Sequence, residues 1–165
     1  MKGGKLITDF YELKVHQLMD RRVWDLPIIT EEEDISNVLN ILGVKNHIWV
    51  VKNKKDKKLV GVITEHDVLS ILTPKHLPAY VFGMPDVRSI QYGTANKVKD
   101  IMSHKVITCS PDEKVIDALA KMMKNRLRRL PVVEDGRLIG ELTLSQLIRK
   151  YYAAMRYYPI VDDKK

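Results

Sequence analysis

Cysteine is almost absent from this 165-residue chain, which contains Cys109 alone. A single cysteine cannot form a disulfide within the chain, which agrees with a reducing compartment. Cys109 lies in an alternation of apolar and polar residues, so we expect a buried structural thiol. Long apolar runs are absent too. None approaches the ~20 residues that span a bilayer, and residues 1–5 lack the apolar core of a secretory signal, so we expect a cytoplasmic protein without membrane contact.

The sequence also lacks the short motifs of common enzyme active sites. It contains no Gly-rich phosphate loop, no Gly-x-Ser-x-Gly, no Cys-x-x-Cys and no His-Glu-x-x-His. The histidines do not have the spacing of metal ligands, and His66 is the one histidine that we expect to face a bound small molecule. They are His16, His47, His66, His76 and His104. We therefore expect a protein that is not an enzyme, with no catalytic residue and no metal site.

Acidic residues are in the minority, with 21 Asp and Glu against 28 Lys and Arg and a formal charge of +7. Such a chain attracts nucleic acids, anionic lipids and phosphorylated small molecules without selecting among them. The basic excess is concentrated in residues 52–58, 121–129 and 164–165. Residues 52–58 are interpreted most simply as a solvated hairpin tip. No aromatic residues are interleaved with the basic runs to stack on bases, so RNA binding is an alternative that we favour less.

What the sequence does contain is a repeated phrase. Gly-Val-Ile-Thr-Glu-His-Asp at residues 61–67 returns 79 positions later as Gly-Glu-Leu-Thr-Leu-Ser-Gln at residues 140–146. Two apolar, β-branched runs separated by turn residues lead into each copy, at residues 48–51 and 59–63 and at residues 130–133 and 138–142. This pattern is typical of a β-hairpin. Apolar residues at helical spacing follow each copy, so we expect helices to begin at Thr64 and Thr143.

The elements before each hairpin are duplicated as well. A helical turn (residues 15–19 and 98–102) leads into a short extended piece. A hydroxyl followed three residues later by Glu then predicts a capping box at the start of a helix, at residues 30–33 and 110–113. Each repeat of about sixty residues thus reads turn, strand, helix, strand, strand, helix. Two such units are expected to pack into one α/β body.

This organisation predicts five parts of the chain. They are an N-terminal extension at residues 1–14, repeat 1 at 15–72, a linker at 73–97, repeat 2 at 98–152, and a helix end and tail at 153–165. The linker is longer than compact domains usually need, so we expect it to cover a surface or contact a partner.

At these residues the chain resembles the CBS-domain family, named for cystathionine β-synthase, and in particular a tandem CBS pair, or Bateman module. The resemblance covers residues 15–152. It rests on the strand Leu-Pro-Val-Val at residues 130–133, the hairpin that closes on Gly140, the phrase at residues 61–67, and above all their duplication. It implies an α/β (α+β) fold of two βαββα repeats with pseudo-twofold symmetry, and clefts that hold adenosine compounds in many relatives.

The resemblance also implies where a ligand would bind. In relatives the aspartate of the Thr-x-x-Asp phrase takes the ribose hydroxyls, while the facing repeat supplies an apolar slot for adenine and basic side chains for phosphate. The first repeat would contribute Val62, Thr64, His66 and Asp67. Val106 and Ile107 would form the base slot, and Arg126, Arg128 and Arg129 would take the phosphates.

The chemistry of these residue types agrees with that assignment. An ionised carboxylate such as Asp67 can accept both hydroxyls of a ribose. Thr64, if it begins a helix, places free N–H groups where they favour a phosphate. On a regular strand, Arg126 and Arg128 lie on one face with Arg129 opposite, and all three offer forked donors.

A helix cap is the alternative interpretation of the phrase, because its last residue can reach back to the N–H of the threonine. Gln146 suits that role as well as Asp67 does. Gln146 carries no charge, however, and would hold a ribose less well. Facing it, the first repeat offers Lys-Asn-His at residues 45–47, with Trp49 in the place of Pro131. We predict one good site at Asp67 and a second cleft that is weak, vacant or differently used.

These observations lead to a hypothesis of function. The chain is expected to be a regulatory module in which an adenine nucleotide, AMP, ADP or ATP, shifts the population of orientations that a protein partner recognises. S-adenosylmethionine and NAD are less favoured ligands, and no catalytic cofactor is expected. A homodimer is expected, and the protein partner is not identified by the sequence. The alternatives are RNA binding and a purely structural dimerisation module with vacant clefts.

Overall fold

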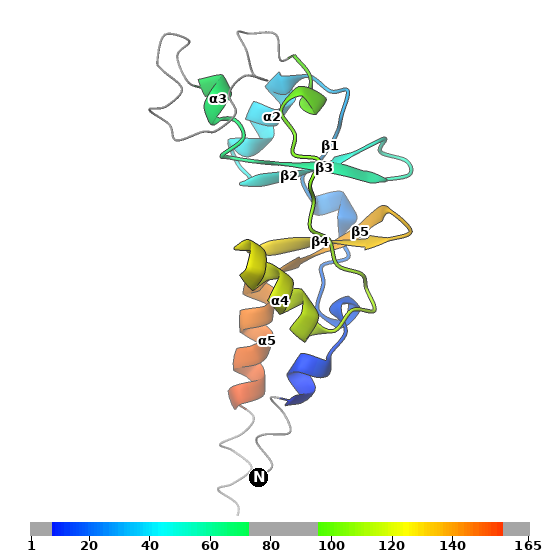
Figure 1. Ribbon diagram of the computed structural model, residues 1–165, viewed down its shortest axis with the longest axis vertical. Coiled ribbons are helices and arrows are strands. Elements are labelled where there is room, and N and C mark those ends of the chain that lie inside the picture. Colours follow the sequence, from blue (N-terminus) through cyan, green and yellow to red (C-terminus); the bar gives the residue numbers. More distant parts are fainter. Residues whose placement is uncertain (1–7, 73–95, 157–165) are drawn as a thin grey trace, which may run out of the picture. The chain divides into compact units, whose positions relative to one another are not determined.

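The computed structural model describes residues 8–72 and 96–156 (Figure 1). Almost all of the predicted linker, residues 1–7 of the predicted N-terminal extension and residues 157–165 of the predicted tail lie outside the described residues. The chain divides into two compact units. Unit 1 combines Met1–Trp24 with Ile107–Lys165, and unit 2 is Asp25–Val106.

Unit 2 is built on a three-stranded sheet of order β1-β2-β3. β1 is parallel to β2, and β2 is antiparallel to β3. Helix α2 and the 3-10 helix at Val98–Asp100 lie on one side of this sheet (Figure 1) and bury their apolar residues in one core with it. The elements are β1 (Ile28–Thr30), α2 (Ile35–Leu42), β2 (His47–Val51), β3 (Leu59–Thr64), α3 (Leu69–Leu72) and the 3-10 helix Val98–Asp100.

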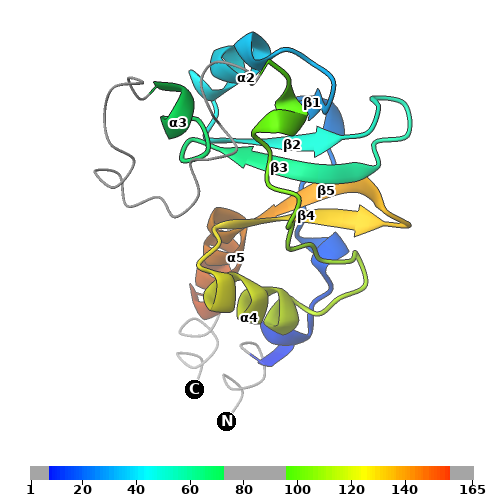
Figure 2. The same ribbon diagram turned by 45° about the horizontal axis from the view of Figure 1, so that its top comes forward.

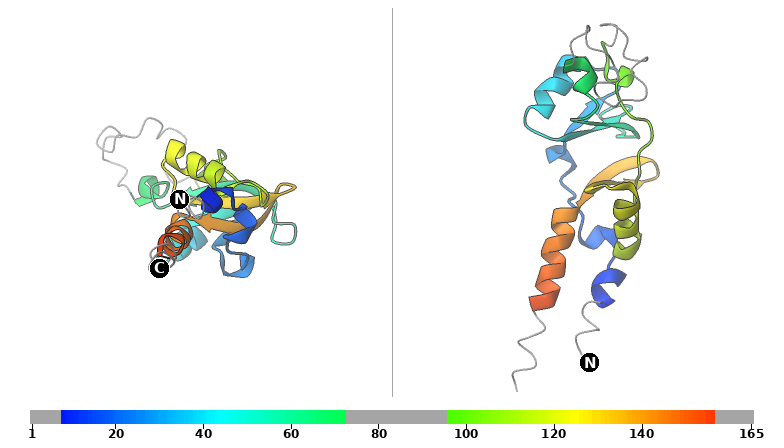
Figure 3. Two further views of the ribbon diagram at one scale, coloured as in Figure 1. Left: turned by 90° about the horizontal axis from the view of Figure 1, so that it is seen from below. Right: turned by 60° about the vertical axis from the view of Figure 1, so that its left-hand side comes forward.

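Unit 1 is built on the antiparallel hairpin of β4 and β5. Helices α4 and α5 lie on the same side of this hairpin (Figures 2 and 3) and close a core that also takes in Phe10 and Val15. Cys109 forms a parallel bridge to Val132, as β1 does to β2 in unit 2. The elements are a helix at residues 8–12, the 3-10 helix Val15–Gln17, α4 (Val115–Asn125), β4 (Arg129–Glu134), β5 (Arg137–Thr143) and α5 (Leu144–Arg156).

The opening turn of each repeat packs in the unit formed by the other repeat. In unit 1 the Val15 N–H donates to the Glu113 carbonyl at 2.9 Å, and in unit 2 the Val98 N–H donates to the Glu33 carbonyl at 3.0 Å. Both valines are fully buried. The sequence repeats and the compact units therefore divide the chain at different places.

Gly61 and Gly140, which open the two copies of the phrase, lie where these opening segments cross the second strand of each hairpin. A Cβ at Gly140 would collide with the backbone oxygen of Asp20. A Cβ at Gly61 would lie 2.7 Å from Met102 Sδ and 3.0 Å from the Ser103 oxygen. Both positions favour glycine because another chain segment passes within contact distance of the strand.

Only one half of each predicted capping box is present, the bond to the Glu side chain, and neither box starts a helix. Glu33 Oε1 accepts a hydrogen bond from the Thr30 N–H at 3.1 Å, and Glu113 Oε2 accepts one from the Ser110 N–H at 3.3 Å. Helices α2 and α4 begin five residues after each hydroxyl, at Ile35 and Val115. The reason is that the carbonyls of the two glutamates accept hydrogen bonds from the opening turns, which holds both boxes in a turn outside the helix.

Candidate functional site

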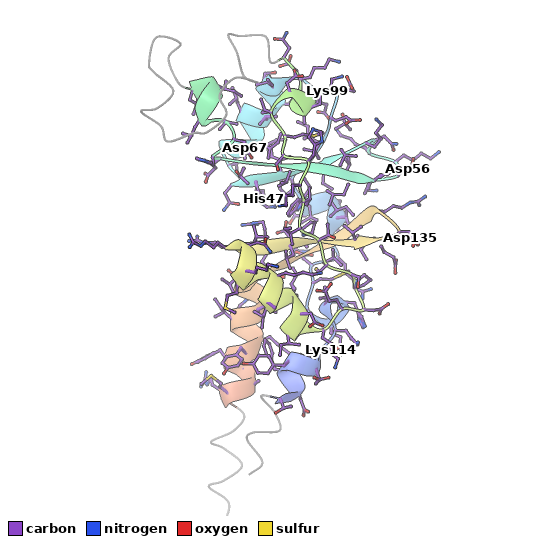
Figure 4. All side chains as sticks on the ribbon, viewed as in Figure 1. His47, Asp56, Asp67, Lys99, Lys114 and Asp135 are labelled. Atoms are coloured by element: carbon purple, nitrogen blue, oxygen red, sulfur yellow. The ribbon has the colours of Figure 1, made fainter. Side chains whose placement is uncertain are left out.

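Strand β3 ends at Thr64 in a turn that the Asp67 carboxylate closes. Asp67 Oδ2 accepts hydrogen bonds from the Thr64 N–H at 2.7 Å and from the Thr64 hydroxyl at 3.0 Å. The Asp67 N–H donates to the Thr64 carbonyl at 3.0 Å. Figure 4 shows Asp67 at the end of the sheet opposite to the hairpin tip that carries Asp56. The carboxylate is therefore positioned by its own turn.

Thr143 begins the same turn in unit 1, with an amide in place of the carboxylate. Gln146 Oε1 accepts from the Thr143 N–H at 2.8 Å, and the Gln146 N–H donates to the Thr143 hydroxyl at 3.3 Å. The capping interaction is thus present in both copies of the phrase. The closing side chain is charged in the first copy and neutral in the second.

The prediction that a helix begins at Thr64 is wrong. In unit 1, α5 starts directly after Thr143, but in unit 2, α3 starts at Leu69 and contains four residues. In unit 2 the intervening residues 65–68 form a turn instead. So short a helix sums few peptide dipoles, and the Thr64 N–H is already donated to Asp67, so the phosphate role predicted for this N–H has no helix behind it.

The other predicted residues of unit 2 lie close to this turn in the chain. Val62 is a half-buried residue of β3 that exchanges backbone hydrogen bonds with Ser103, at 3.0 and 2.9 Å. His66 is exposed in the turn itself, and Val106 is half-buried three residues after Ser103. The structure thus brings Val62, Thr64, His66 and Asp67 together at the end of β3 in unit 2.

The three arginines predicted to bind phosphate lie between the end of α4 and the first residue of β4, in unit 1. Arg126 is exposed and ends α4 in the left-handed conformation, with φ 55° and ψ 40°. Arg128 is exposed, and its carbonyl accepts from the Leu144 N–H at 2.8 Å. Since β4 begins only at Arg129, the prediction that Arg126 and Arg128 share one strand face is wrong. The left-handed residue turns the chain before any strand alternation begins.

Arg129 has a carboxylate partner that the sequence did not reveal. Its Nη1 atom lies 3.2 Å from Oε1 of Glu141, whose side chain is 7% exposed, against 26% for Arg129. Glu141 occupies, in the second copy of the phrase, the place of Val62 in the first. The signal available in the sequence was a charged residue within an otherwise apolar strand.

Ile107 opens the second segment of unit 1 and packs against its core. The next carbonyl, that of Thr108, accepts a hydrogen bond from Lys121 Nζ at 2.9 Å. The same ammonium pairs with Glu113 Oε2 at 2.7 Å. Helix α4 therefore fixes the backbone beside Ile107, a role of Lys121 that no local pattern in the sequence indicates.

His47 holds in unit 2 the place that Arg129 holds in unit 1, because each residue pairs with the threonine of its own phrase. His47 is buried, and its Nδ1 lies 3.1 Å from Asn46 Oδ1. Its ring packs edge-on against that of Trp49, with the ring centroids 5.0 Å apart. Figure 4 shows it at the same end of the sheet as Asp67. Unit 2 thus presents an imidazole where unit 1 presents a guanidinium.

The nine predicted residues divide between the units, each group being positioned within its own unit. Unit 2 holds Val62, Thr64, His66, Asp67 and Val106, and unit 1 holds Ile107, Arg126, Arg128 and Arg129. Within residues 8–72 and 96–156, no His, Cys, Asp and Glu side chains cluster in a way that could hold a metal ion. In the same ranges no helix is long and apolar enough to cross a lipid bilayer.

Comparison with known proteins identifies the family. Residues 15–74 and 98–153 each match the family model of the CBS domain, so the chain belongs to the CBS domain family. The predicted tandem pair with its α+β fold is confirmed by this match and by similar solved structures.

Three similar proteins cover most of the chain. Uncharacterized protein MJ1426 of Methanocaldococcus jannaschii is 31% identical over 139 residues, 73% of this chain and 83% of that protein. The crystal structure of CBSX2 in complex with AMP has a TM-score of 0.67 and 25% identity, covering 88% of this chain and 98% of that chain. The CBS domain pair of protein MJ0100, in complex with 5′-methylthioadenosine and S-adenosyl-L-methionine, has a TM-score of 0.59 and 26% identity, covering 86% and 97%. Seven further curated relatives are longer, and the chain spans 27% to 57% of their lengths.

Proposed function

We propose that this protein is a regulatory module, without catalytic activity, that senses an adenine nucleotide (AMP, ADP or ATP) through Asp67. The observation that carries the proposal is the pair of matching turns at Thr64 and Thr143. The neutral amide of Gln146 closes one turn with the same kind of hydrogen bond that the carboxylate of Asp67 uses to close the other. The turn therefore does not account for the negative charge of Asp67, whereas binding of two ribose hydroxyls does.

The proposal keeps the residues that the resemblance to relatives implies. Asp67 would bind the ribose, and Val62, Thr64 and His66 would contribute to the site from the same repeat. Val106 and Ile107 would line the adenine slot, and Arg126, Arg128 and Arg129 would face the phosphates. Two CBS pairs of 25% and 26% identity, solved with AMP and with 5′-methylthioadenosine and S-adenosyl-L-methionine, support an adenosine ligand. Binding of the ligand would shift the population of conformations, and a protein partner in the cytoplasm would recognise the favoured one.

The ion pairs of the hairpin tip in unit 2 support a small ligand over RNA. Lys52 pairs with Glu31 at 2.5 Å, and Lys54 pairs with Glu33 at 3.2 Å. Part of the positive charge of residues 52–58 is thus balanced within the unit. A surface that follows a nucleic-acid backbone needs cations that neutralise phosphates instead.

Calorimetry on matched variants tests the proposal. Wild type, Asp67→Ala and Gln146→Ala are titrated with AMP, ADP, ATP, S-adenosylmethionine, NADH and a short RNA. Loss of one or two charge-assisted hydrogen bonds is expected to weaken nucleotide binding by roughly ten- to a hundredfold in Asp67→Ala. Gln146→Ala is the control, since it loses the same kind of cap without losing a charge.

Three outcomes would contradict the proposal. Unchanged nucleotide affinity in Asp67→Ala would leave Asp67 a cap only. RNA binding that falls steeply with salt, without nucleotide binding, would favour a nucleic-acid protein. Absence of any binding would favour a purely structural module.

We also propose that the protein forms a homodimer through α4 and α5. The outer faces of these helices expose large apolar side chains, and a groove of about 320 Å³ lined by Phe10, Tyr11 and α5 extends this surface. The exposed residues are Ile116, Met123, Ile148, Tyr152 and Met155. Spacings of four and three residues along each helix (116, 120, 123 and 148, 152, 155) are those of helices that pack against other helices.

Light scattering tests the dimer. Wild type is expected at twice the chain mass of 19.1 kDa. Ile148→Glu places a charge in the apolar face and is expected to give a monomer, while its exposed neighbour Arg149→Glu is expected to stay dimeric. A monomeric wild type, or the same mass for both variants, would contradict this interface.

A further inference from the structure

We propose that Glu141 is a specificity-determining residue, which limits how much the site favours additional phosphates by holding Arg129 in an ion pair. The inference rests on the proposed function, since it assumes that a ligand phosphate reaches Arg129. It goes beyond that function because it assigns the preference of the site for ligand charge to Glu141, a residue that the sequence did not single out.

The geometry of the β4–β5 hairpin places both side chains on one face. Arg129 pairs in register with Thr143, and Pro131 pairs with Glu141, so Arg129 and Glu141 are diagonal neighbours across the two strands. The alternate residues, among them Leu130 and Leu142, point into the core with α4 and α5. Arg129 and Glu141 therefore lie on the face turned away from these helices, 3.2 Å apart.

The ion pair is more than a contact between flexible surface side chains. Glu141 is buried, with 7% of its side chain exposed. Its backbone exchanges hydrogen bonds with Asp20 at 2.8 and 3.0 Å, so the carboxylate cannot withdraw with the main chain. At such exposure the attraction between the charges is screened far less than between two solvated side chains.

The consequence is an arginine whose charge is already balanced. A phosphate that approaches Arg129 meets a guanidinium paired with a carboxylate, and the carboxylate repels the phosphate over nearly the same distance. Arg126 and Arg128 are exposed and remain for a first phosphate. Each further phosphate near Arg129 adds little to binding, so the wild type is expected to bind AMP and ATP with similar affinity.

The other unit supports a joint role for the two residues. His47 stands at the place of Arg129 in unit 2, and neutral Val62 stands at the place of Glu141. The guanidinium and the carboxylate thus occur together in unit 1, and in unit 2 both of their places are taken by other residues. This is expected if Glu141 acts through Arg129 rather than through the fold of the hairpin, which both units share.

The test is the ratio of AMP to ATP dissociation constants, measured by calorimetry in the wild type and four variants. Glu141→Gln keeps the shape of the side chain and an acceptor for Arg129 but removes the charge. It is expected to raise the ratio by about tenfold or more, because ATP then binds more tightly relative to AMP. Arg129→Gln leaves the carboxylate unbalanced and is expected to shift the ratio toward AMP. The double variant is expected to return to within about threefold of wild type. Glu134→Gln, an exposed residue at the other end of β4, is the control and is expected to leave the ratio unchanged.

A ratio in Glu141→Gln within twofold of wild type would overturn the inference while leaving adenine-nucleotide binding in place. If Glu141→Gln does not fold, Arg129→Gln decides alone, because an unchanged ratio there would equally overturn it. If neither nucleotide binds the wild type, the proposed function is wrong and the inference falls with it. The measured ratio therefore separates failure of the specificity role from failure of the sensor function.

Discussion

Gly140→Ala is predicted to destabilise the protein more than Gly61→Ala does, although the two glycines occupy matching places in the repeats. A Cβ at Gly140 would collide with the backbone oxygen of Asp20. The backbone has little room to yield, because Asp20 and Glu141 exchange hydrogen bonds at 2.8 and 3.0 Å. At Gly61 the nearest atom, at 2.7 Å, is Met102 Sδ, which belongs to a flexible side chain.

The magnitudes follow from what has to move. Gly140→Ala is expected to break or distort two buried backbone hydrogen bonds, and with the accompanying strain the cost is about 2–4 kcal/mol. Gly61→Ala requires the methionine side chain to change rotamer and the facing oxygen to shift slightly, at a cost of about 1–2 kcal/mol. For a chain of this length each kcal/mol lowers the melting temperature by roughly 2–4 °C.

Thermal and urea unfolding, followed by far-UV circular dichroism, measure both variants. Gly43→Ala is the matched control, because its φ of −64° suits alanine and its nearest neighbours, at 3.4 and 3.5 Å, are at ordinary contact distance. This control is expected to be as stable as wild type or up to about 1 kcal/mol more stable. The reasoning fails if Gly140→Ala matches the control, or if Gly61→Ala proves the costlier change.

Three further predictions concern side chains. Burial raises the pKa of the Cys109 thiol from 9.0 to about 12. Its contribution to stability is therefore complete below pH 9 and lost as the pH rises toward 12, and alkaline unfolding of Cys109→Ala is expected to lack this component. Asp67→Ala and Gln146→Ala each remove a cap, so urea titrations are expected to show similar losses of about 1 kcal/mol, and a loss in one variant alone would contradict the equivalence of the turns. Hydrogen bonds from two lysines lower the pKa of Glu32 from 4.5 to about 2, so stability that it contributes above pH 4.5 is lost toward pH 2; an NMR titration of its carboxyl in the ordinary range would contradict the ion pairs.

The strands of the two hairpins could be predicted almost to the residue, because their signals are local. Apolar, β-branched runs bounded by turn residues predicted strands at 48–51 and 59–63, and the structure has His47–Val51 and Leu59–Thr64. It could not be predicted that the opening turn of each repeat packs in the unit formed by the other repeat. The local sequence around Val15 and Val98 is equally compatible with packing in either unit. Long-range packing alone places Val15 in the core of unit 1 and Val98 in the core of unit 2.

Features of the candidate site that depend on residue type could be predicted from the sequence. Features that depend on the pairing register of β4 and β5 could not. The loss of charge from Asp67 to Gln146 is visible in the sequence. The Arg129–Glu141 pair is not, because counting back from the hairpin tip pairs Arg129 with Leu142. The irregularity between Val132 and Val133 shifts that register by one residue, which puts Arg129 opposite Thr143 and diagonal to Glu141.

Binding of deoxy nucleotides tests the assignment of Asp67 most directly, because it removes the ligand's half of the proposed hydrogen bonds. If Asp67 accepts both ribose hydroxyls, 2′-deoxy-AMP and 3′-deoxy-AMP are each expected to bind the wild type about tenfold more weakly than AMP. In Asp67→Ala the three ligands are expected to bind with the same affinity, since the partner of the missing hydroxyl is gone. Deoxy nucleotides that bind the wild type as tightly as AMP, or that lose the same factor in both proteins, would contradict the account.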